Sequence, residues 1–115
     1  MKEVTVNAEN KKLGRLASEV AVLLRGKNES TFERHVLPKV KVTVTNAGKI
    51  DTTERKLSQM THKRYSLYPG GLKEISGTQV VATKGKSELL RKAVNVMLPK
   101  HNSRPKIMKN LMITE

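Results

Sequence analysis

A strand–helix–strand pattern in the first 45 residues constrains the fold of this chain more than any other feature. Residues 3–8 alternate enough to predict a short strand, and residues 40–45 alternate strictly, with one apolar face. Between them, residues 14–25 predict a helix, because apolar side chains recur every three or four positions and Gly26 follows as a stop signal. Such a unit is expected to be right-handed, with its two strands in parallel.

The rest of the chain predicts shorter elements. The polar residues 27–39 indicate an irregular surface link, and residues 46–60 are ambiguous. Residues 62–66 are predicted to be extended, and residues 68–72 form a Pro-Gly turn. A short helix over 77–83 is predicted to be capped by Thr78, and a second helix to start at Ser87 and end before Pro99, with Leu90, Ala93, Val94 and Met97 on one face. A last strand is predicted at 111–113.

The composition is strongly basic. The chain has 23 Lys and Arg against 10 Asp and Glu, which gives a formal net charge of +13 over 115 residues. A compact domain with this charge repels itself, and an anionic partner, most commonly nucleic acid, relieves the repulsion. Residues 61–115 hold 11 of the basic side chains and only 3 acidic ones, so this half is the better candidate for the anion-facing surface.

Length and hydropathy predict one small intracellular domain over residues 1–115. The longest unbroken apolar run, residues 20–24, is too short to cross a membrane, so no membrane partner is expected. The amino terminus has neither a signal-peptide nor a transit-peptide pattern. The absence of cysteine removes any disulfide framework and is compatible with a reducing compartment.

Motifs for catalysis or metal binding are weak. Gly85-Lys86-Ser87 resembles the end of a phosphate-binding loop, but Val80 stands where that loop needs glycine, so we interpret the segment as a helix start with a serine cap. The histidines His35, His62 and His101 lie too far apart in sequence for a zinc site. Neither an adjacent carboxylate pair nor a nucleophile motif is present. We therefore expect no enzyme, metal, cofactor or small-molecule substrate.

Three basic stretches are candidates for contact with nucleic acid. Residues 11–15 place three cations around a predicted helix start, where backbone N–H groups attract phosphate. Residues 62–73 interleave cations with two tyrosines and a glycine pair, which suits base stacking and close backbone approach. Residues 100–109 form a basic run without an acid. The alternatives are a solvated basic turn, a Pro-Gly turn with its tyrosines packed on the core, and a disordered tail.

Taken together, several segments resemble the bacterial large-subunit ribosomal protein L13 family. The segments that match in order, and at nearly the family's spacing, are residues 12–21 with 24–27, His35-Val36, Val44-Thr45-Asn46-Ala47-Gly48-Lys49-Ile50, Tyr68-Pro69-Gly70-Gly71-Leu72-Lys73, and Ala93-Val94 through Met97-Leu98-Pro99-Lys100. This resemblance implies an α/β domain with a small, mainly parallel sheet of about four strands and helices on both sides, in three layers.

The resemblance also implies a structural role in the large ribosomal subunit, in the cytoplasm. The expected partners are the large-subunit ribosomal RNA, bound early in assembly, and neighbouring large-subunit ribosomal proteins. The alternative is another basic architectural protein that binds nucleic acid. By carry-over, the expected RNA-facing residues are Lys12, Arg15, Lys27, His35, Lys49, Tyr68, Gly70, Gly71, Lys73 and Lys100. The basic stretches add Lys11, Lys63, Arg64, His101 and Arg104.

The sequence departs from the family pattern in several places. The aromatic strand expected before Val4 and the tail expected after Ile113 are missing, so we expect a version shortened at both ends. Val22-Leu23 stands where the family has two arginines. The newly apolar Val22 is expected either to touch a neighbouring protein or to extend the core. Arg104 is expected to supply a cation that the family places elsewhere after Lys100.

Overall fold

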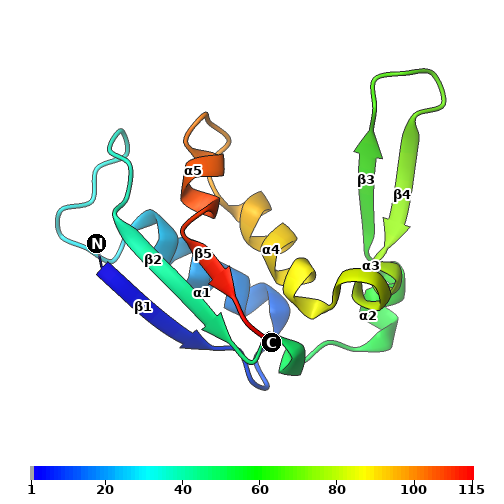
Figure 1. Ribbon diagram of the computed structural model, residues 1–115, viewed down its shortest axis with the longest axis horizontal. Coiled ribbons are helices and arrows are strands. Elements are labelled where there is room, and N and C mark those ends of the chain that lie inside the picture. The colour runs from blue at the N-terminus through cyan, green and yellow to red at the C-terminus, as the bar shows by residue number, and fades with distance from the viewer. Residues whose placement is uncertain (1) are drawn as a thin grey trace.

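The first half of the chain folds as its sequence predicts. The computed structural model describes residues 2–115 (Figure 1). Strand β1 (Lys2–Asn7) leads to helix α1 (Leu13–Arg25), and an irregular link leads to strand β2 (Val40–Thr45). Helix α1 ends at Gly26, whose φ of 71° is a left-handed conformation that glycine adopts at little cost. The predicted strand–helix–strand unit is confirmed.

The main sheet is parallel. Its strand order is β1–β2–β5, with β5 spanning Leu111–Ile113. Val4 pairs with Val42, and Val44 pairs with Ile113, so the last strand joins the opposite edge of β2 from the first. The α/β class and the mainly parallel sheet are both confirmed.

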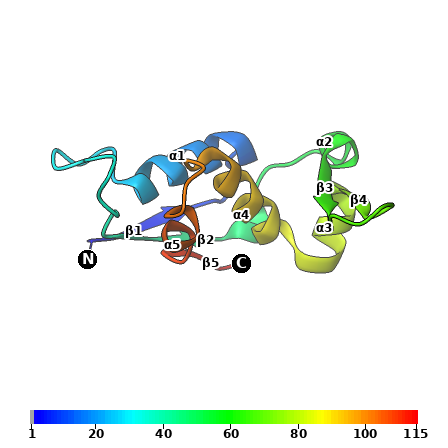
Figure 2. The ribbon, with the colours of Figure 1, turned by 90° about the horizontal axis from the view of Figure 1, so that it is seen from above.

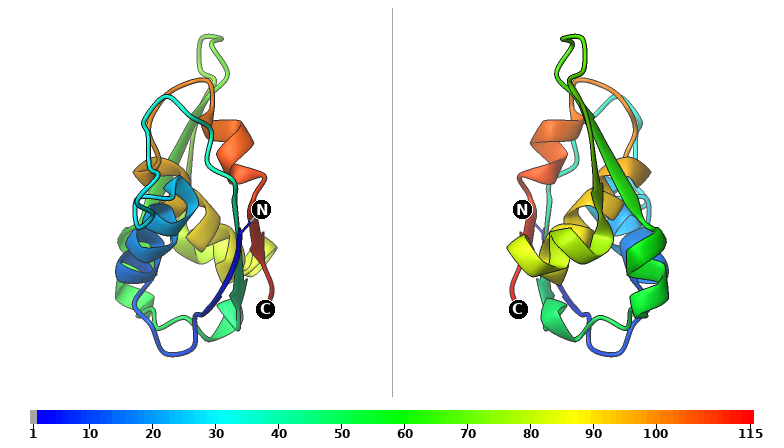
Figure 3. Two further views of the ribbon diagram at one scale, coloured as in Figure 1. Left: turned by 90° about the vertical axis from the view of Figure 1, so that its left-hand side faces the viewer. Right: turned by 90° about the vertical axis from the view of Figure 1, so that its right-hand side faces the viewer.

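Helices α1 and α4 (Lys86–Met97) lie on the same side of this sheet (Figures 2 and 3). The alternate residues Val40, Val42 and Val44 of β2 are buried beneath them, whereas Lys41 is exposed on the other face. Residues 2–115 thus place three strands in the parallel sheet, with α1 and α4 in one layer on one of its faces, rather than about four strands with helices on both sides in three layers. The physical reason is the strict alternation in β2, since a face of polar side chains needs no second helical layer.

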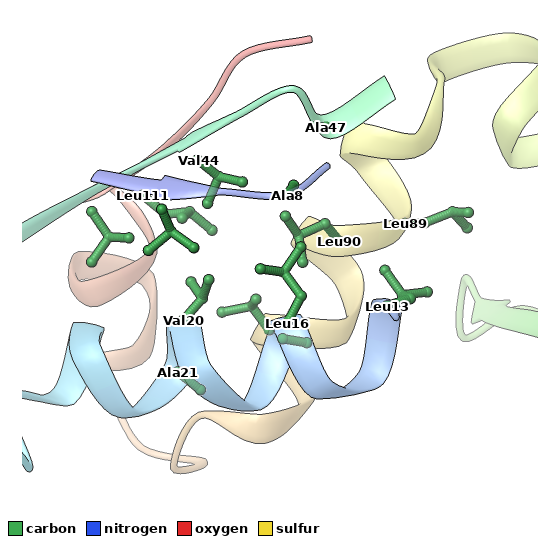
Figure 4. Packing of buried hydrophobic residues seen from close by; sticks show 14 of the residues in the cluster. Ala8, Leu13, Leu16, Val20, Ala21, Val44, Ala47, Leu89, Leu90 and Leu111 are labelled. Atoms are coloured by element: carbon green, nitrogen blue, oxygen red, sulfur yellow. The ribbon is translucent and has the colours of Figure 1, made fainter. Parts of the chain in front are cut away.

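The core lies between α1, α4 and the sheet (Figure 4). Leu16, Val20 and Leu24 of α1 are at most 1% exposed, and Leu90 and Val94 of α4 are fully buried. Burying each of these side chains contributes roughly 1.5–3 kcal/mol to the free energy of unfolding. This apolar stripe is the one that the helical periodicity of the sequence predicts.

Two predicted helix caps are wrong. Helix α3 (Gly77–Lys84) is capped by Ser76 and not by Thr78. The Ser76 hydroxyl accepts a hydrogen bond from the Gln79 backbone N–H at 3.4 Å, and the Gln79 side chain accepts one from the Ser76 backbone N–H at 3.3 Å. This reciprocal pair satisfies two N–H groups at once, which Thr78, already inside the first turn, is not placed to do.

Helix α4 begins one residue earlier than predicted, and no side chain caps it. The Ser87 hydroxyl instead donates to a Glu115 carboxylate oxygen at 3.3 Å. Lys86 Nζ donates to the Ile50 carbonyl at 3.0 Å and ties α4 to the segment after β2. The helix start over Gly85-Lys86-Ser87 is confirmed. Its predicted apolar face is buried at Leu90 and Val94, but Met97 is 43% exposed.

The segment with an ambiguous sequence forms a short 3₁₀ turn and a helix, and a hairpin follows. The turn η1 (Ala47–Lys49) precedes helix α2 (Glu54–Gln59), and β3 (Thr61–Tyr65) then pairs antiparallel with β4 (Leu72–Ser76). The hairpin projects away from the parallel sheet (Figures 1 and 3). The radius of gyration is accordingly 15.1 Å, above the roughly 13 Å expected for this length. Helix α5 (Arg104–Met108) leads into β5.

Candidate nucleic-acid interface

The β3–β4 hairpin exposes almost all of its side chains. Every residue from Lys63 to Ile75 is exposed except Gly71, which is half-buried. Tyr65 is 56% exposed and Tyr68 74%, so neither ring packs on the core. An isolated two-stranded hairpin is marginally stable in water. The hairpin therefore adds little to the core and leaves most of its side chains exposed.

The register of the hairpin sorts its side chains onto two faces. Residues directly opposite each other in an antiparallel pair share a face, and alternate residues along a strand change face. Arg64 lies opposite Lys73, and Tyr65 lies opposite Leu72. We call one side the cationic face, made of His62, Arg64, Lys73 and Ile75. We call the other the ion-paired face, made of Lys63, Tyr65, Leu72 and Glu74.

The cationic face carries an unbalanced charge. Like charges placed directly opposite each other destabilise a strand pair, and Arg64 and Lys73 are such a pair. Within residues 2–115 neither side chain makes an ion pair with a carboxylate. On the ion-paired face, by contrast, Lys63 Nζ lies 3.7 Å from a Glu74 carboxylate oxygen. A bound anion would relieve the repulsion between Arg64 and Lys73.

The tip of the hairpin confirms the predicted Pro-Gly turn. Gly70 has a φ of 74°, and the Gly71 backbone N–H donates to the Tyr68 carbonyl at 2.9 Å. A Cβ added at Gly71 would lie 2.9 Å from that carbonyl oxygen and would overlap the Ser66 hydroxyl. Leu67, 83% exposed, adopts a φ of 72°, a strained conformation for a leucine. The turn thus needs glycine at position 71 and holds Tyr68 out at its end.

The foot of the hairpin is packed closely against α2. The Gly77 backbone N–H donates to the Met60 carbonyl at 3.0 Å. A Cβ added at Gly77 would lie 2.8 Å from the Leu57 carbonyl oxygen, and Leu57 itself is buried. This close approach anchors the exposed hairpin at its base. The sequence patterns did not reveal it, because they assigned no strand to residues 72–76.

The predicted basic residues at the start of α1 are partly engaged within the chain. Lys12 Nζ lies 2.5 Å from an Asp51 carboxylate oxygen. A hydrogen bond from Lys12, together with its charge, holds the pKa of Asp51 below its usual value. Lys11 Nζ lies 3.5 Å from a Glu19 oxygen, whereas the exposed Arg15 makes no ion pair within residues 2–115. Of these three cations, Arg15 is the most available to a phosphate.

The other predicted residues lie on separate elements. His35 and His101 line one groove between the link after α1 and the loop after α4. His35 Nε2 is 3.3 Å from a Glu33 oxygen, and His101 Nδ1 accepts a hydrogen bond from the Ser103 backbone N–H at 3.1 Å. Lys49 Nζ lies 3.7 Å from a Glu9 carboxylate oxygen, and the Arg104 guanidinium donates to the Asn95 carbonyl at 3.4 Å. Lys100 is exposed after α4, and Lys27 is exposed beside Val22 and Met97.

Val22 does not extend the core, because it is 44% exposed on the outer surface of α1. Within residues 2–115 no group of three or more His, Asp or Glu side chains is placed to hold a metal ion. Over the same part of the chain, no helix combines the length and the hydropathy needed to span a membrane. The chemistry that the surface offers is that of exposed cations, two exposed tyrosines and glycine-rich backbone.

The amino-acid sequence of the whole chain, residues 1–115, matches the family model of ribosomal protein L13. The chain belongs to the ribosomal protein L13 family. The large ribosomal subunit protein uL13 of Citrifermentans bemidjiense is 47% identical over 108 residues, which cover 94% of this chain and 75% of that protein. The uL13 protein of Geobacter sp. is 46% identical, with the same coverage of both chains. That of Natranaerobius thermophilus is 45% identical over 95% of this chain and 76% of its own length.

Membership of the L13 family confirms the resemblance that the sequence motifs indicate. The L13 relatives are named as ribosomal proteins of the large subunit and not as enzymes, in agreement with the weakness of every catalytic motif. His62 belongs to the predicted basic stretch 62–73, whereas Lys92 lies in helix α4, outside every predicted stretch. The structure links the two, because burial and the positive charge of Lys92 both lower the pKa of His62.

Proposed function

We propose that this chain is a structural constituent of the large ribosomal subunit, in the cytoplasm, and that its hairpin binds the large-subunit ribosomal RNA. The observation that carries the proposal is the pair of Arg64 and Lys73, opposed across the hairpin with no carboxylate partner within residues 2–115. The names of the L13 relatives support the ribosomal location. The net charge of +13 supports an anionic partner.

The binding mechanism is the recognition of RNA shape and phosphates. Arg64 and Lys73 bind phosphate oxygens, and their mutual repulsion disappears when the anion is in place. Tyr68, at the tip, stacks on an unpaired base, and the glycine pair beside it allows the RNA backbone to approach. These contacts require neither catalysis nor a cofactor.

Further contacts come from the cations on other elements. Arg15, Lys27 and Lys100 are exposed, and no ion pair holds them within residues 2–115. Because they lie on α1, after α1 and after α4, they reach RNA segments other than the one at the hairpin. Fixing several segments relative to one another is how such a protein aids early subunit assembly. The exposed Val22 suits contact with a neighbouring ribosomal protein.

A salt titration of RNA binding tests this function. If about six cations contact phosphate, the logarithm of the association constant falls with the logarithm of salt concentration with a slope of roughly −4 to −5. The measurement uses the full chain and purified large-subunit ribosomal RNA. A slope near zero contradicts the electrostatic mechanism. Equal affinity for duplex DNA in competition would instead favour a general architectural protein.

A further inference from the structure

Two loops that are distant in sequence line one groove, which we call the histidine groove. The link after α1 contributes Arg34 and His35, and the loop after α4 contributes His101. Arg25, the last residue of α1, lines the same groove. The buried side chain of Ile107 lines it as well. The histidine groove therefore gathers basic side chains from three parts of the chain next to an apolar one.

The imidazole ring of His101 is held in one tautomer. The Ser103 backbone N–H donates to His101 Nδ1 at 3.1 Å, so Nδ1 accepts and the neutral ring carries its proton on Nε2. Within residues 2–115 this is the hydrogen bond that the ring makes, and it leaves Nε2 free to donate. Two backbone bonds hold the loop: the His101 N–H donates to the Pro99 carbonyl, and the Arg104 N–H donates to the His101 carbonyl, both at 3.0 Å. The loop thus presents a neutral, oriented N–H donor.

Arg25 is a positioned cation without an acidic partner. Its guanidinium carbon lies 5.7 Å from the centre of the Phe32 ring, and Phe32 lines the same groove. Within residues 2–115 neither Arg25 nor the exposed Arg34 makes an ion pair. Over that range Glu33 is the one acid that lines the groove, and its carboxylate lies 3.3 Å from His35 Nε2. The two guanidinium groups are therefore left for an acceptor from outside the chain.

We propose that the histidine groove binds one phosphate of the RNA backbone, with Arg25 and Arg34 supplying charge and His101 supplying a neutral donor from Nε2. A phosphodiester offers hydrogen-bond acceptors alone, which matches these donors. Because Ile107 makes part of the lining apolar, the local dielectric is lower than in water and each contact is stronger. The link after α1 lies on the far side of the parallel sheet from the hairpin (Figures 1 and 2), so the groove holds a different RNA segment.

Two substitutions at His101 separate a phosphate contact from a purely structural role. His101→Asn keeps an acceptor near the position of Nδ1 for the Ser103 N–H but loses the donor, whereas His101→Gln keeps an N–H donor near the position of Nε2. We expect His101→Asn to weaken binding to purified large-subunit ribosomal RNA several-fold, and His101→Gln to bind nearly as well as the unmodified chain. A purely structural role predicts the opposite order, so RNA binding by His101→Asn that equals or exceeds that of His101→Gln overturns the proposal.

The salt dependence of binding is the second measurement. A neutral donor releases no counterion, so His101→Asn is expected to lower the affinity without changing the salt slope. Arg25→Gln is expected to make the slope shallower by about 0.7–0.9. Lys41→Gln, at an exposed lysine on the open face of the parallel sheet, is the control and should change neither quantity.

The histidine groove rests on the proposed function, and the same measurements distinguish the failure of each. If the unmodified chain binds RNA and the variants at Arg25 and His101 behave like Lys41→Gln, the groove is overturned and the proposed function stands. If the unmodified chain does not bind RNA, both are overturned.

Discussion

The parallel-sheet body and the hairpin are built on opposite principles. In the body, α1 and α4 bury a continuous stripe of leucine and valine side chains against β2. In the hairpin, the residues from Lys63 to Ile75 bury almost nothing, and two cations face each other across the strands. The difference shows that the body supplies the free energy of folding, whereas the hairpin leaves its groups exposed. On the proposed function, stability and RNA binding belong to separate parts of the chain.

The largest expected effect comes from a matched pair of leucine truncations. Leu90→Ala in the fully buried core is expected to lower the free energy of unfolding by about 2–5 kcal/mol, because it removes packed methyl groups and leaves a cavity. Leu72→Ala, at a side chain that is 55% exposed on the hairpin, is expected to cost less than about 1 kcal/mol. Urea unfolding measures both. Equal losses would show that the hairpin shares the stability of the body.

Substitutions at the hairpin tip should weaken RNA binding and leave the free energy of unfolding nearly unchanged, the reverse of the leucine truncation in the core. Tyr68→Ala is expected to weaken RNA binding by about 1–3 kcal/mol through loss of base stacking, with little change in unfolding. Gly71→Val should weaken binding as well, since its side chain would collide with the Tyr68 carbonyl and distort the turn. Glu19→Ala, on the exposed side of α1, is the control. Equal binding and equal subunit assembly by all three variants would count against the tip as a contact.

Reversing the charge at Lys73 should change stability and RNA binding in opposite directions. Lys73→Glu turns the repulsion with Arg64 into an attractive cross-strand pair, worth roughly 0.2–1 kcal/mol to the hairpin. The same change should weaken RNA binding, because it removes one phosphate contact and adds a negative charge. Thermal unfolding and RNA binding, measured side by side, are expected to move in opposite directions. A loss of both would mean that Lys73 is needed for the fold.

The smallest expected effect is a dependence of stability on pH. The pKa of His62 in the folded chain is lowered from 6.5, so the unfolded chain takes up a proton first as the pH falls. The free energy of unfolding should therefore decrease between pH 7 and pH 5.5. His62→Gln should flatten this decrease, whereas His35→Gln, at an exposed position, should leave it in place. Urea unfolding at the two pH values measures the effect, and an unchanged decrease in His62→Gln would rule out His62 as its source.

Much of the fold was predictable because it depends on neighbouring residues. The strict alternation of residues 40–45 and the helical spacing of residues 14–25 each bury one face of an element, and Gly26 ends the helix by its own backbone freedom. The Pro-Gly turn follows from the same local chemistry. Residues 72–76 carry no such pattern, since both faces of β4 are largely exposed and only pairing with β3 makes it a strand.

The candidate site was predictable in composition but not in arrangement. By itself, the sequence determined the excess of cations after residue 60, the exposed Pro-Gly turn and membership of the L13 family. Only the tertiary structure decided that Arg64 faces Lys73, that Lys12 is engaged by Asp51, and that the charge of Lys92 acts on His62. The physical reason is the separation along the chain over which each kind of interaction acts. Local patterns act over a few residues, whereas strand register and the meeting of a hairpin with a helix depend on how distant segments pack.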